Sequence, residues 1–169
     1  MTEKLTTYYR SPIGVLEIIG SRNGVTSVLF VDDAAGDSAA PPELRDCAAQ
    51  LDEYFGGTRR EFSLKLDLRG TEFQKRVWRA LQKIPFGKTV SYLDIASSLG
   101  NKESTRAVGR ANGQNPVSII VPCHRVIGSD RSLTGYGGGL WRKRWLLNFE
   151  SQTPRDDLFT FAESNASRR

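Results

Sequence analysis

The sequence places one reactive side chain directly beside a proton acceptor. Cys123 is followed by His124, the only histidine among the 169 residues, and then by Arg125. A thiol is a strong soft nucleophile, but at its usual pKa of about 8.5 it is mostly protonated at neutral pH and needs a base or a positive neighbour. The pair therefore indicates nucleophilic sulfur chemistry. The structural alternative is a buried cysteine beside a histidine that fills space.

Two cysteines and one histidine are too few for a disulfide framework or a zinc site. No Cys-x-x-Cys pair occurs, and Cys47 falls on a helical pattern of apolar residues. We expect no metal and no cofactor, and a reducing cytoplasm suits the free thiols. The first ten residues lack a secretory apolar stretch, and apolar runs such as 117–121 are too short to cross a bilayer, so we expect no membrane association.

Charge divides the chain into two unlike parts. The net charge is +5, with 7 basic and 10 acidic residues up to Leu66 and 17 basic against 9 acidic residues after it. Neutralisation of phosphates by Lys and Arg is the usual reason for such a basic part, which indicates a polyanionic partner. Solubility alone is the other explanation.

Residues 1–68 are predicted to form a small α+β domain. Short β-prone runs at 5–10, 15–20 and 25–31, separated by turn compositions, indicate a three-stranded meander. Apolar residues at helical spacing follow, and a Gly56-Gly57 pair ends that helix. Alternation in 62–68 predicts a further strand. The helical positions are Leu44, Cys47, Ala48, Leu51 and Phe55.

Residues 69–152 are predicted to be mainly helical. One amphipathic helix ends at Pro85 and Gly87, Ser91 opens a second, and a third runs from about 103 to 112, which makes a helix, a tight turn and a helix. Such pairs often place a helix against DNA. The apolar run 117–121 predicts a strand that leads into Cys123. A last helix carries Trp141 and Trp145, and residues 153–169 form a polar tail.

The segment around Cys123 resembles a known active-site signature. Pro122-Cys123-His124-Arg125, set between 115–121 and Val126-Ile127-Gly128, is similar to the signature of the O6-alkylguanine-DNA alkyltransferase family. The resemblance spans 71 to about 150, whereas the first domain matches in layout only. It implies an α+β fold: a small N-terminal α/β domain of ribonuclease H-like type, then a helical, winged-helix-like domain that binds DNA and holds the active site.

The resemblance implies a one-step displacement at an alkyl carbon. Cys123 would attack that carbon, and His124 would draw off the thiol proton through a water. Glu150 occupies the place of the glutamate that orients the histidine, although by itself it would be a solvated acid at a helix end. Tyr92 occupies the position of the tyrosine that gives a proton to the departing base. Its alternative role is a hydroxyl that bonds a phosphate or a backbone group.

The resemblance also implies how DNA is held. Arg106 resembles the residue that fills the gap left by a flipped base, and the small neighbours Ala107 and Gly109 permit close approach to a minor groove. The alternative is that Arg106 is an ordinary exposed cation on a helix. Asn115 resembles a residue that braces the turn before the active site. Tyr136 and the glycines after it resemble a pocket wall. This chain departs from some relatives by having Gly137 in place of serine, which leaves the width of the pocket open.

The implied function is single-turnover DNA repair, because a thioether cannot be hydrolysed and the protein is consumed. The partner would be duplex DNA that carries O6-alkylguanine, with O4-alkylthymine a poorer substrate. The protein would act as a monomer, and cooperative assembly on DNA stays open. Two other functions are considered: a non-catalytic or regulatory protein that binds alkylated DNA, and a cysteine hydrolase, which would need an oxyanion hole.

Overall fold

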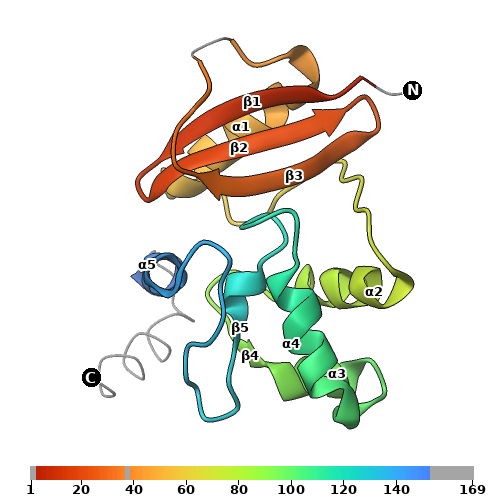
Figure 1. Cartoon of the computed structure of the whole chain (residues 1–169). Coiled ribbons are helices and arrows are strands. Elements are labelled where there is room, and N and C mark those ends of the chain that lie inside the picture. The colour runs from red at the N-terminus through yellow and green to blue at the C-terminus, as the bar shows by residue number, and fades with distance from the viewer. Residues whose placement is uncertain (1–2, 37–38, 153–169) are drawn as a thin grey trace. The chain divides into compact units, whose positions relative to one another are not determined.

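The computed structural model describes residues 3–36 and 39–152 (Figure 1). Two compact units account for them. The first combines the residues up to Thr71 with Pro116–Ile120, and the second combines Glu72–Asn115 with the described residues from Val121 onward. The predicted boundaries at 68 and 152 stay predictions, and the predicted polar tail 153–169 lies outside the described residues.

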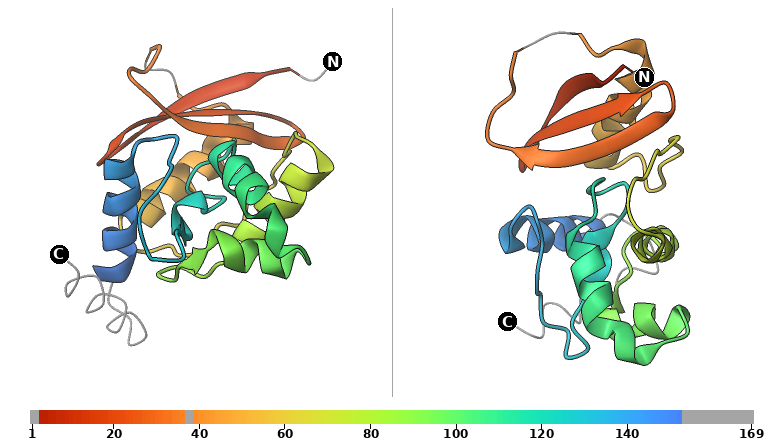
Figure 2. Two further views of the ribbon diagram at one scale, coloured as in Figure 1. Left: turned by 60° about the horizontal axis from the view of Figure 1, so that its bottom comes forward. Right: turned by 45° about the vertical axis from the view of Figure 1, so that its right-hand side comes forward.

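The first unit is built on a three-stranded antiparallel sheet with the order β1-β2-β3, which confirms the predicted meander. Its strands are β1 (Leu5–Ser11), β2 (Gly14–Ser21) and β3 (Gly24–Val31). Helix α1 (Pro42–Phe55) covers one face of this sheet, as Figures 1 and 2 show. The helix ends at Gly56, and Gly57 takes a φ of 83°, which suits glycine. Cys47 is buried on the sheet side, as its helical spacing predicts.

The strand predicted for 62–68 is wrong. Only Leu66 pairs, in an isolated bridge with Val25. Before that bridge the backbone of Ser63 is satisfied by a side chain instead of a strand, because Gln50 of α1 accepts from Ser63 N at 3.0 Å and donates to Ser63 O at 3.2 Å. A side chain that takes up these backbone groups leaves no ladder to extend. The alternating apolar side chains of this segment are therefore half-buried, but the backbone does not form a strand.

The strand predicted for 117–121 is also wrong. Val117 bridges to Val28, and Ser118 N donates to Val28 O at 2.8 Å. The run then leaves the extended conformation at Ile119, which has a φ of 73°. This region is costly for a β-branched residue and is kept only where the surroundings impose it. The apolar run is therefore a short bridge followed by a buried turn, which leads into the active-site segment.

The second unit contains the helices that the sequence predicts. Helix α4 (Thr105–Gly113) packs against α2 (Glu72–Leu81) and α3 (Tyr92–Ser98), and a single turn of 3-10 helix, η1 (Lys102–Ser104), joins α3 to α4 (Figure 2). Buried Trp78 fixes α2 to α4 by donating to Ala111 O at 2.9 Å. Ser91 caps α3 reciprocally with Asp94, which confirms the predicted start of that helix.

The remaining elements of the second unit surround the Cys123 segment. The two-stranded parallel pair β4 (Val90–Ser91) and β5 (Val126–Ile127) flanks a 3-10 turn, η2 (Cys123–Arg125). The last helix is α5 (Leu140–Gln152), and its Leu146 and Leu147 are buried. Trp141 is 56% exposed, so it does not belong to the apolar face of that helix. Across the described residues, no helix is long and apolar enough to span a membrane.

Candidate active site

Cys123 begins the 3-10 turn η2 and is held from two sides. Its own N–H donates to Val121 O at 2.8 Å. Asn115 Nδ2 donates to the same Val121 O at 2.8 Å, and Asn112 Nδ2 approaches Cys123 O at 3.4 Å. The cysteine is only 6% exposed. The predicted bracing residue Asn115 thus lies against the backbone that carries the thiol.

The thiol of Cys123 is tuned by opposing effects. Burial raises its pKa, because a thiolate is poorly solvated in the interior. A hydrogen bond from the side chain of Asn115 and the positive charge of Lys143 act in the other direction. Cys47 is also free and buried, but burial raises its pKa to about 12 with no such compensation. Burial is the larger effect, so the pKa of Cys123 stays above its ordinary value, but only Cys123 has neighbours that oppose the rise.

His124, Glu150 and Arg125 form one buried cluster. His124 Nε2 lies 2.8 Å from Glu150 Oε2. Arg125 donates from Nε to Oε1 at 2.9 Å and from Nη2 to Oε2 at 3.0 Å, so it binds the same carboxylate in a bidentate manner. Gly87 N adds a bond to Oε1 at 3.3 Å, and Arg125 Nη1 donates to Ile84 O at 2.7 Å. The acid predicted to orient the histidine therefore does contact it.

The charges of this cluster follow from its contacts. Burial alone would raise the pKa of Glu150, but the charges and hydrogen bonds of His124 and Arg125 hold it well below its usual range. Burial lowers the pKa of His124 despite the nearby carboxylate, so the imidazole is neutral at neutral pH. A neutral ring that donates from Nε2 to Glu150 must keep Nδ1 as an acceptor. Within the described residues this buried Nδ1 has no hydrogen-bond partner.

Tyr92 is the first residue of α3, and its hydroxyl donates to Thr134 O at 2.9 Å. Burial raises the pKa of the phenol, so it stays protonated at neutral pH. Lys143 of α5 joins the same group: its Nζ donates to Thr134 O at 2.9 Å and lies 3.5 Å from the Tyr92 oxygen. The structure thus shows Tyr92 bonded to a backbone carbonyl, which is the second role considered from the sequence.

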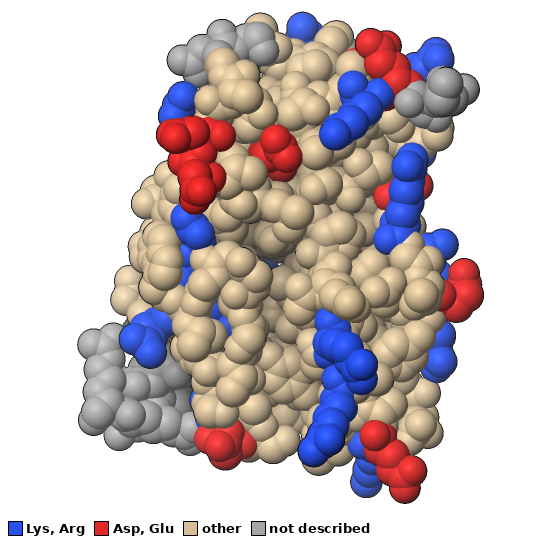
Figure 3. Space-filling view, viewed as in Figure 1, with Lys and Arg blue, Asp and Glu red and all other residues tan. Residues whose placement is uncertain are grey.

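Arg106, Ala107 and Gly109 lie on α4. Arg106 is exposed near the start of the helix, and Arg110, also exposed, follows one turn later. Figure 3 shows a run of Lys and Arg side chains over the surface that α4 forms. Ala107 is half-buried, and a Cβ built on Gly109 would meet only the Tyr92 ring, at 3.9 Å. The helix therefore offers exposed positive charge beside small residues.

The glycine-rich segment after Thr134 forms a turn in which Gly139 N donates to Tyr136 O at 2.9 Å. Gly135 and Gly139 take φ values of 57° and 92°, which explains why glycine stands at both ends of this turn. Gly137 is exposed, and a Cβ there would meet nothing within 4 Å. Tyr136 is half-buried. The turn therefore has room for a small side chain at position 137.

Two buried charged residues near the site received no role from the sequence: Arg125 of the cluster, and Lys143, which bonds with Tyr92 and Thr134. Lys143 lies on the buried face of α5 with Leu146, Leu147 and Glu150, at spacings of three, four and seven residues. That spacing could have revealed a buried charge on the core face. Arg125 carried a weaker signal, because its need for a carboxylate becomes visible only when Glu150 is seen beside it.

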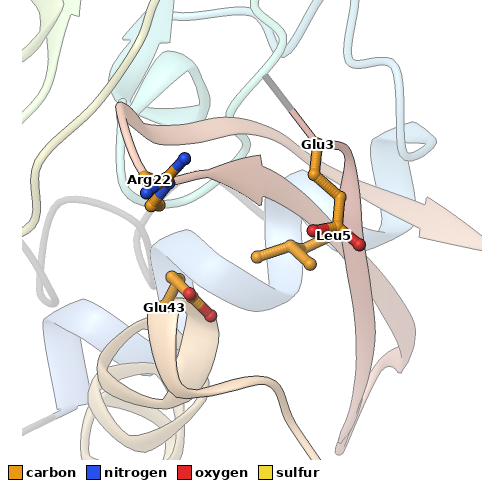
Figure 4. A pocket seen from close by; sticks show the side chains of 4 residues that line it. All are labelled: Glu3, Leu5, Arg22 and Glu43. Atoms are coloured by element: carbon orange, nitrogen blue, oxygen red, sulfur yellow. The ribbon is translucent and has the colours of Figure 1, made fainter. Parts of the chain in front are cut away.

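Two other features lie outside this cluster. A cavity of about 240 Å³ in the first unit is lined by Glu3, Leu5, Arg22 and Glu43 (Figure 4), and it contains none of the predicted site residues. In the described parts of the chain, no group of three or more His, Cys, Asp or Glu side chains is arranged to hold a metal ion.

Comparison with known families matches both units. A family model described as 6-O-methylguanine DNA methyltransferase, DNA binding domain, covers residues 72–152. A second, described as 6-O-methylguanine DNA methyltransferase, ribonuclease-like domain, covers residues 4–68. These matches confirm the α+β fold predicted from the sequence, with a ribonuclease-like part before a DNA-binding part.

Individual relatives agree with the family models. The methylated-DNA–protein-cysteine methyltransferase of Mycolicibacterium paratuberculosis is 50% identical over 156 residues, which cover 89% of this chain and 94% of that protein. The constitutive enzyme of that name from Bacillus subtilis is 51% identical over 110 residues, or 64% of this chain and 67% of its own.

Solved structures show the same similarity. The crystal structure of the Mycobacterium tuberculosis O6-methylguanine methyltransferase has a TM-score of 0.82 and 44% identity, covering 94% of this chain and 99% of that one. The M. tuberculosis OGT protein in complex with DNA has a TM-score of 0.79 and 46% identity, covering 94% and 98%.

Proposed function

Because this chain belongs to the 6-O-methylguanine DNA methyltransferase family, we propose that Cys123 is the residue that takes the methyl group from O6 of guanine in DNA. The protein is a DNA-repair methyltransferase that binds DNA and transfers the group to one of its own cysteines. We further propose which residues carry out the transfer and which alkylated bases react.

The observation that carries the proposal is the arrangement around His124. Its Nε2 is occupied by an ionised Glu150 that Arg125 keeps charged, so Nδ1 is left as the basic nitrogen next to Cys123 in the sequence. A cysteine followed by a histidine whose tautomer is set by a carboxylate has the logic of a hydrolase triad. Here the nucleophile attacks an alkyl carbon instead of the carbonyl carbon of an acyl group.

The transfer conserves atoms and charge. His124 Nδ1 takes the proton of the Cys123 thiol through a water, and the sulfur lone pair forms the new bond to the methyl carbon. The bond from that carbon to O6 breaks, and its electron pair stays with guanine. The Tyr92 hydroxyl leaves Thr134 O and bonds to the guanine instead. It then gives the guanine a proton, since a guanine anion leaves poorly. Proton return from His124 to Tyr92 completes the step, with a thioether and an unmodified guanine as products.

The methyl carbon lies inside the duplex, so the base must rotate out before Cys123 can reach it. Arg106 is exposed near the start of α4 and fills the space that the base leaves, while Ala107 and Gly109 allow the helix to approach a minor groove. Tyr136 and Gly137 form the wall of the pocket that receives the base. Phosphate contacts from the basic surface of α4 position the helix without reading sequence.

Several further properties belong to the proposal. The thioether is permanent, so each molecule repairs one lesion and needs no cofactor. O6-alkylguanine is the preferred lesion, and O4-alkylthymine reacts less well. The protein acts as a monomer in the cytoplasm, where reducing conditions keep the Cys123 thiol free.

Stoichiometry tests the proposal. An excess of duplex that holds one O6-methylguanine is incubated with the protein, and restored guanine is counted against time. We expect a plateau at one repaired base per protein molecule. Repair that continues past this ratio would show turnover and overturn the single-use mechanism. Binding of the duplex with no repaired base would identify a non-catalytic DNA-binding protein.

A further inference from the structure

Asn112 is a buried polar side chain beside the nucleophile, and the mechanism above gives it no role. It lies near the end of α4 and is only 2% exposed. Its Nδ2 faces Cys123 O at 3.4 Å, which is long for a hydrogen bond. The preceding residue is fixed in place, because Ala111 O accepts from buried Trp78 at 2.9 Å. The Asn112 amide is therefore held close to the active-site turn η2.

The amide oxygen of Asn112 has no donor among the described residues. A carbonyl such as Cys123 O can only accept, so the NH₂ group of Asn112 must face it and Oδ1 must face elsewhere. Within the part of the chain that the structure describes, Oδ1 is buried and has no hydrogen-bond partner. Such an acceptor is costly, and in native proteins an ordered water or a ligand usually satisfies it. Oδ1 therefore requires a donor other than the described side chains.

His124 Nδ1 is a second acceptor of this kind. The neutral ring donates from Nε2 to Glu150, and Nδ1 is buried with no partner among the described residues. Both acceptors belong to residues at the same carbonyl, because His124 follows Cys123 directly and Asn112 faces Cys123 O. Two acceptors cannot bond to each other. A water molecule, which carries two hydrogens, is the smallest group that satisfies both.

We propose that Asn112 is a positioning residue whose Oδ1 binds the water that carries the proton from the Cys123 thiol to His124. This water donates one hydrogen to Asn112 Oδ1 and the other to His124 Nδ1. Both of its hydrogens are then directed, so a lone pair faces the thiol and accepts from it. The inference deepens the proposed function and rests on Cys123 being the nucleophile.

The proton transfer through this water is balanced. The thiol proton moves to the water oxygen, and the water passes the hydrogen that faces His124 to Nδ1. The water is thereby regenerated, the imidazole becomes positively charged, and the sulfur carries the negative charge. The hydrogen that faces Asn112 does not move. Without Oδ1 the water would turn more freely and would present a lone pair to the sulfur less often.

The single histidine of the chain allows a direct test, because protein labelled with nitrogen-15 histidine contains one imidazole. NMR without DNA compares wild type, Asn112→Leu and the matched control Gln82→Leu, which removes an exposed amide of the same unit. We expect the Nδ1 resonance to move downfield in Asn112→Leu, because the water loses a partner and Nδ1 loses its hydrogen bond. The Nε2 resonance should stay in place, since Glu150 still binds it. Gln82→Leu should move neither resonance.

Single-turnover kinetics gives a second readout. The rate of methyl transfer should fall about tenfold in Asn112→Leu, since general base catalysis is weakened but not removed. DNA affinity should stay unchanged. A slower rate with an unmoved Nδ1 resonance would overturn the proposal and leave Asn112 a packing role. A wild-type rate in this variant would overturn it as well.

Should Asn112→Leu not fold, the wild-type protein supplies the readout. A long-lived water should show nuclear Overhauser contacts both to the Asn112 amide protons and to the Hε1 proton of His124. Absence of either contact would contradict the inference. Failure of wild-type protein to take a methyl from DNA would instead defeat the proposed function, and it would leave the NMR results unaffected.

Discussion

His124 Nε2 and Glu150 Oε2 are 26 residues apart in sequence and 2.8 Å apart in the structure, and both side chains are buried. The contact joins the turn that carries Cys123 to the end of α5. Arg125 binds the same carboxylate, so one acid orients the histidine and neutralises a buried guanidinium. Loss of Glu150 therefore affects both the chemistry and the stability of the second unit.

Glu150→Gln keeps the shape of the side chain and removes its charge. We expect the free energy of unfolding to fall by about 3 kcal/mol, because Arg125 is left buried without a counter-charge. Urea unfolding measures this change. Glu103→Gln removes an exposed acid of the same unit and should stay within about 0.5 kcal/mol of wild type. Equal stabilities of the two variants would show that the buried pair has no net effect.

Acid should destabilise the protein in two steps. The folded-state pKa values of His124 and Glu150 both lie below their unfolded values. The unfolded chain therefore binds protons first, and stability is lost as pH falls, beginning below about 6.5 for His124 and below about 4.3 for Glu150. Unfolding free energies at several pH values measure this loss, and Glu150→Gln should lack most of the lower step. A wild-type stability that does not change between pH 7 and 4 would contradict this account.

Tyr92→Phe removes the proton donor and keeps the ring beside Lys143. We expect the rate of methyl transfer to fall by about 10² or more, since general acid catalysis contributes in that range. Single-turnover kinetics on a duplex with O6-methylguanine measures the rate, and DNA affinity should change little. A wild-type rate in this variant would exclude Tyr92 as the donor.

Arg106→Ala and Arg110→Ala are matched variants, because both side chains are exposed on α4. Each should weaken DNA binding to a similar extent through the loss of one phosphate contact. Only Arg106→Ala should lower the ratio of the transfer rate on duplex DNA to the rate on a single strand, where no base pair has to open. Identical ratios would assign Arg106 a phosphate role alone.

Local signals allowed much of the fold to be predicted. The turns of the meander, the Gly56-Gly57 stop and the Ser91 cap each depend on neighbouring residues, and the structure confirms all three. The errors at 62–68 and 117–121 have a different origin. Gln50 takes up the backbone of Ser63, and Ile119 leaves the extended conformation. Both depend on tertiary packing, which apolar spacing does not report.

The candidate site divides in the same way. Cys123 and His124 adjoin in sequence, so their chemistry is visible there. Lys143 could have been suspected from its position on the apolar face of α5, but its partners are backbone carbonyls that sequence does not identify. The charge balance among Glu150, Arg125 and His124 could be recognised only from the three-dimensional structure, because these residues are brought together by the fold.

The most direct test of the account is the intact mass of the protein after reaction with a duplex that carries one O6-methylguanine, followed by peptide mapping. We expect the mass of one added methyl group per molecule, located on Cys123, with none in Cys123→Ala and an unchanged result in Cys47→Ala. A methyl group on another residue, or restored guanine with an unmodified protein, would contradict the assignment of Cys123 as the permanent acceptor.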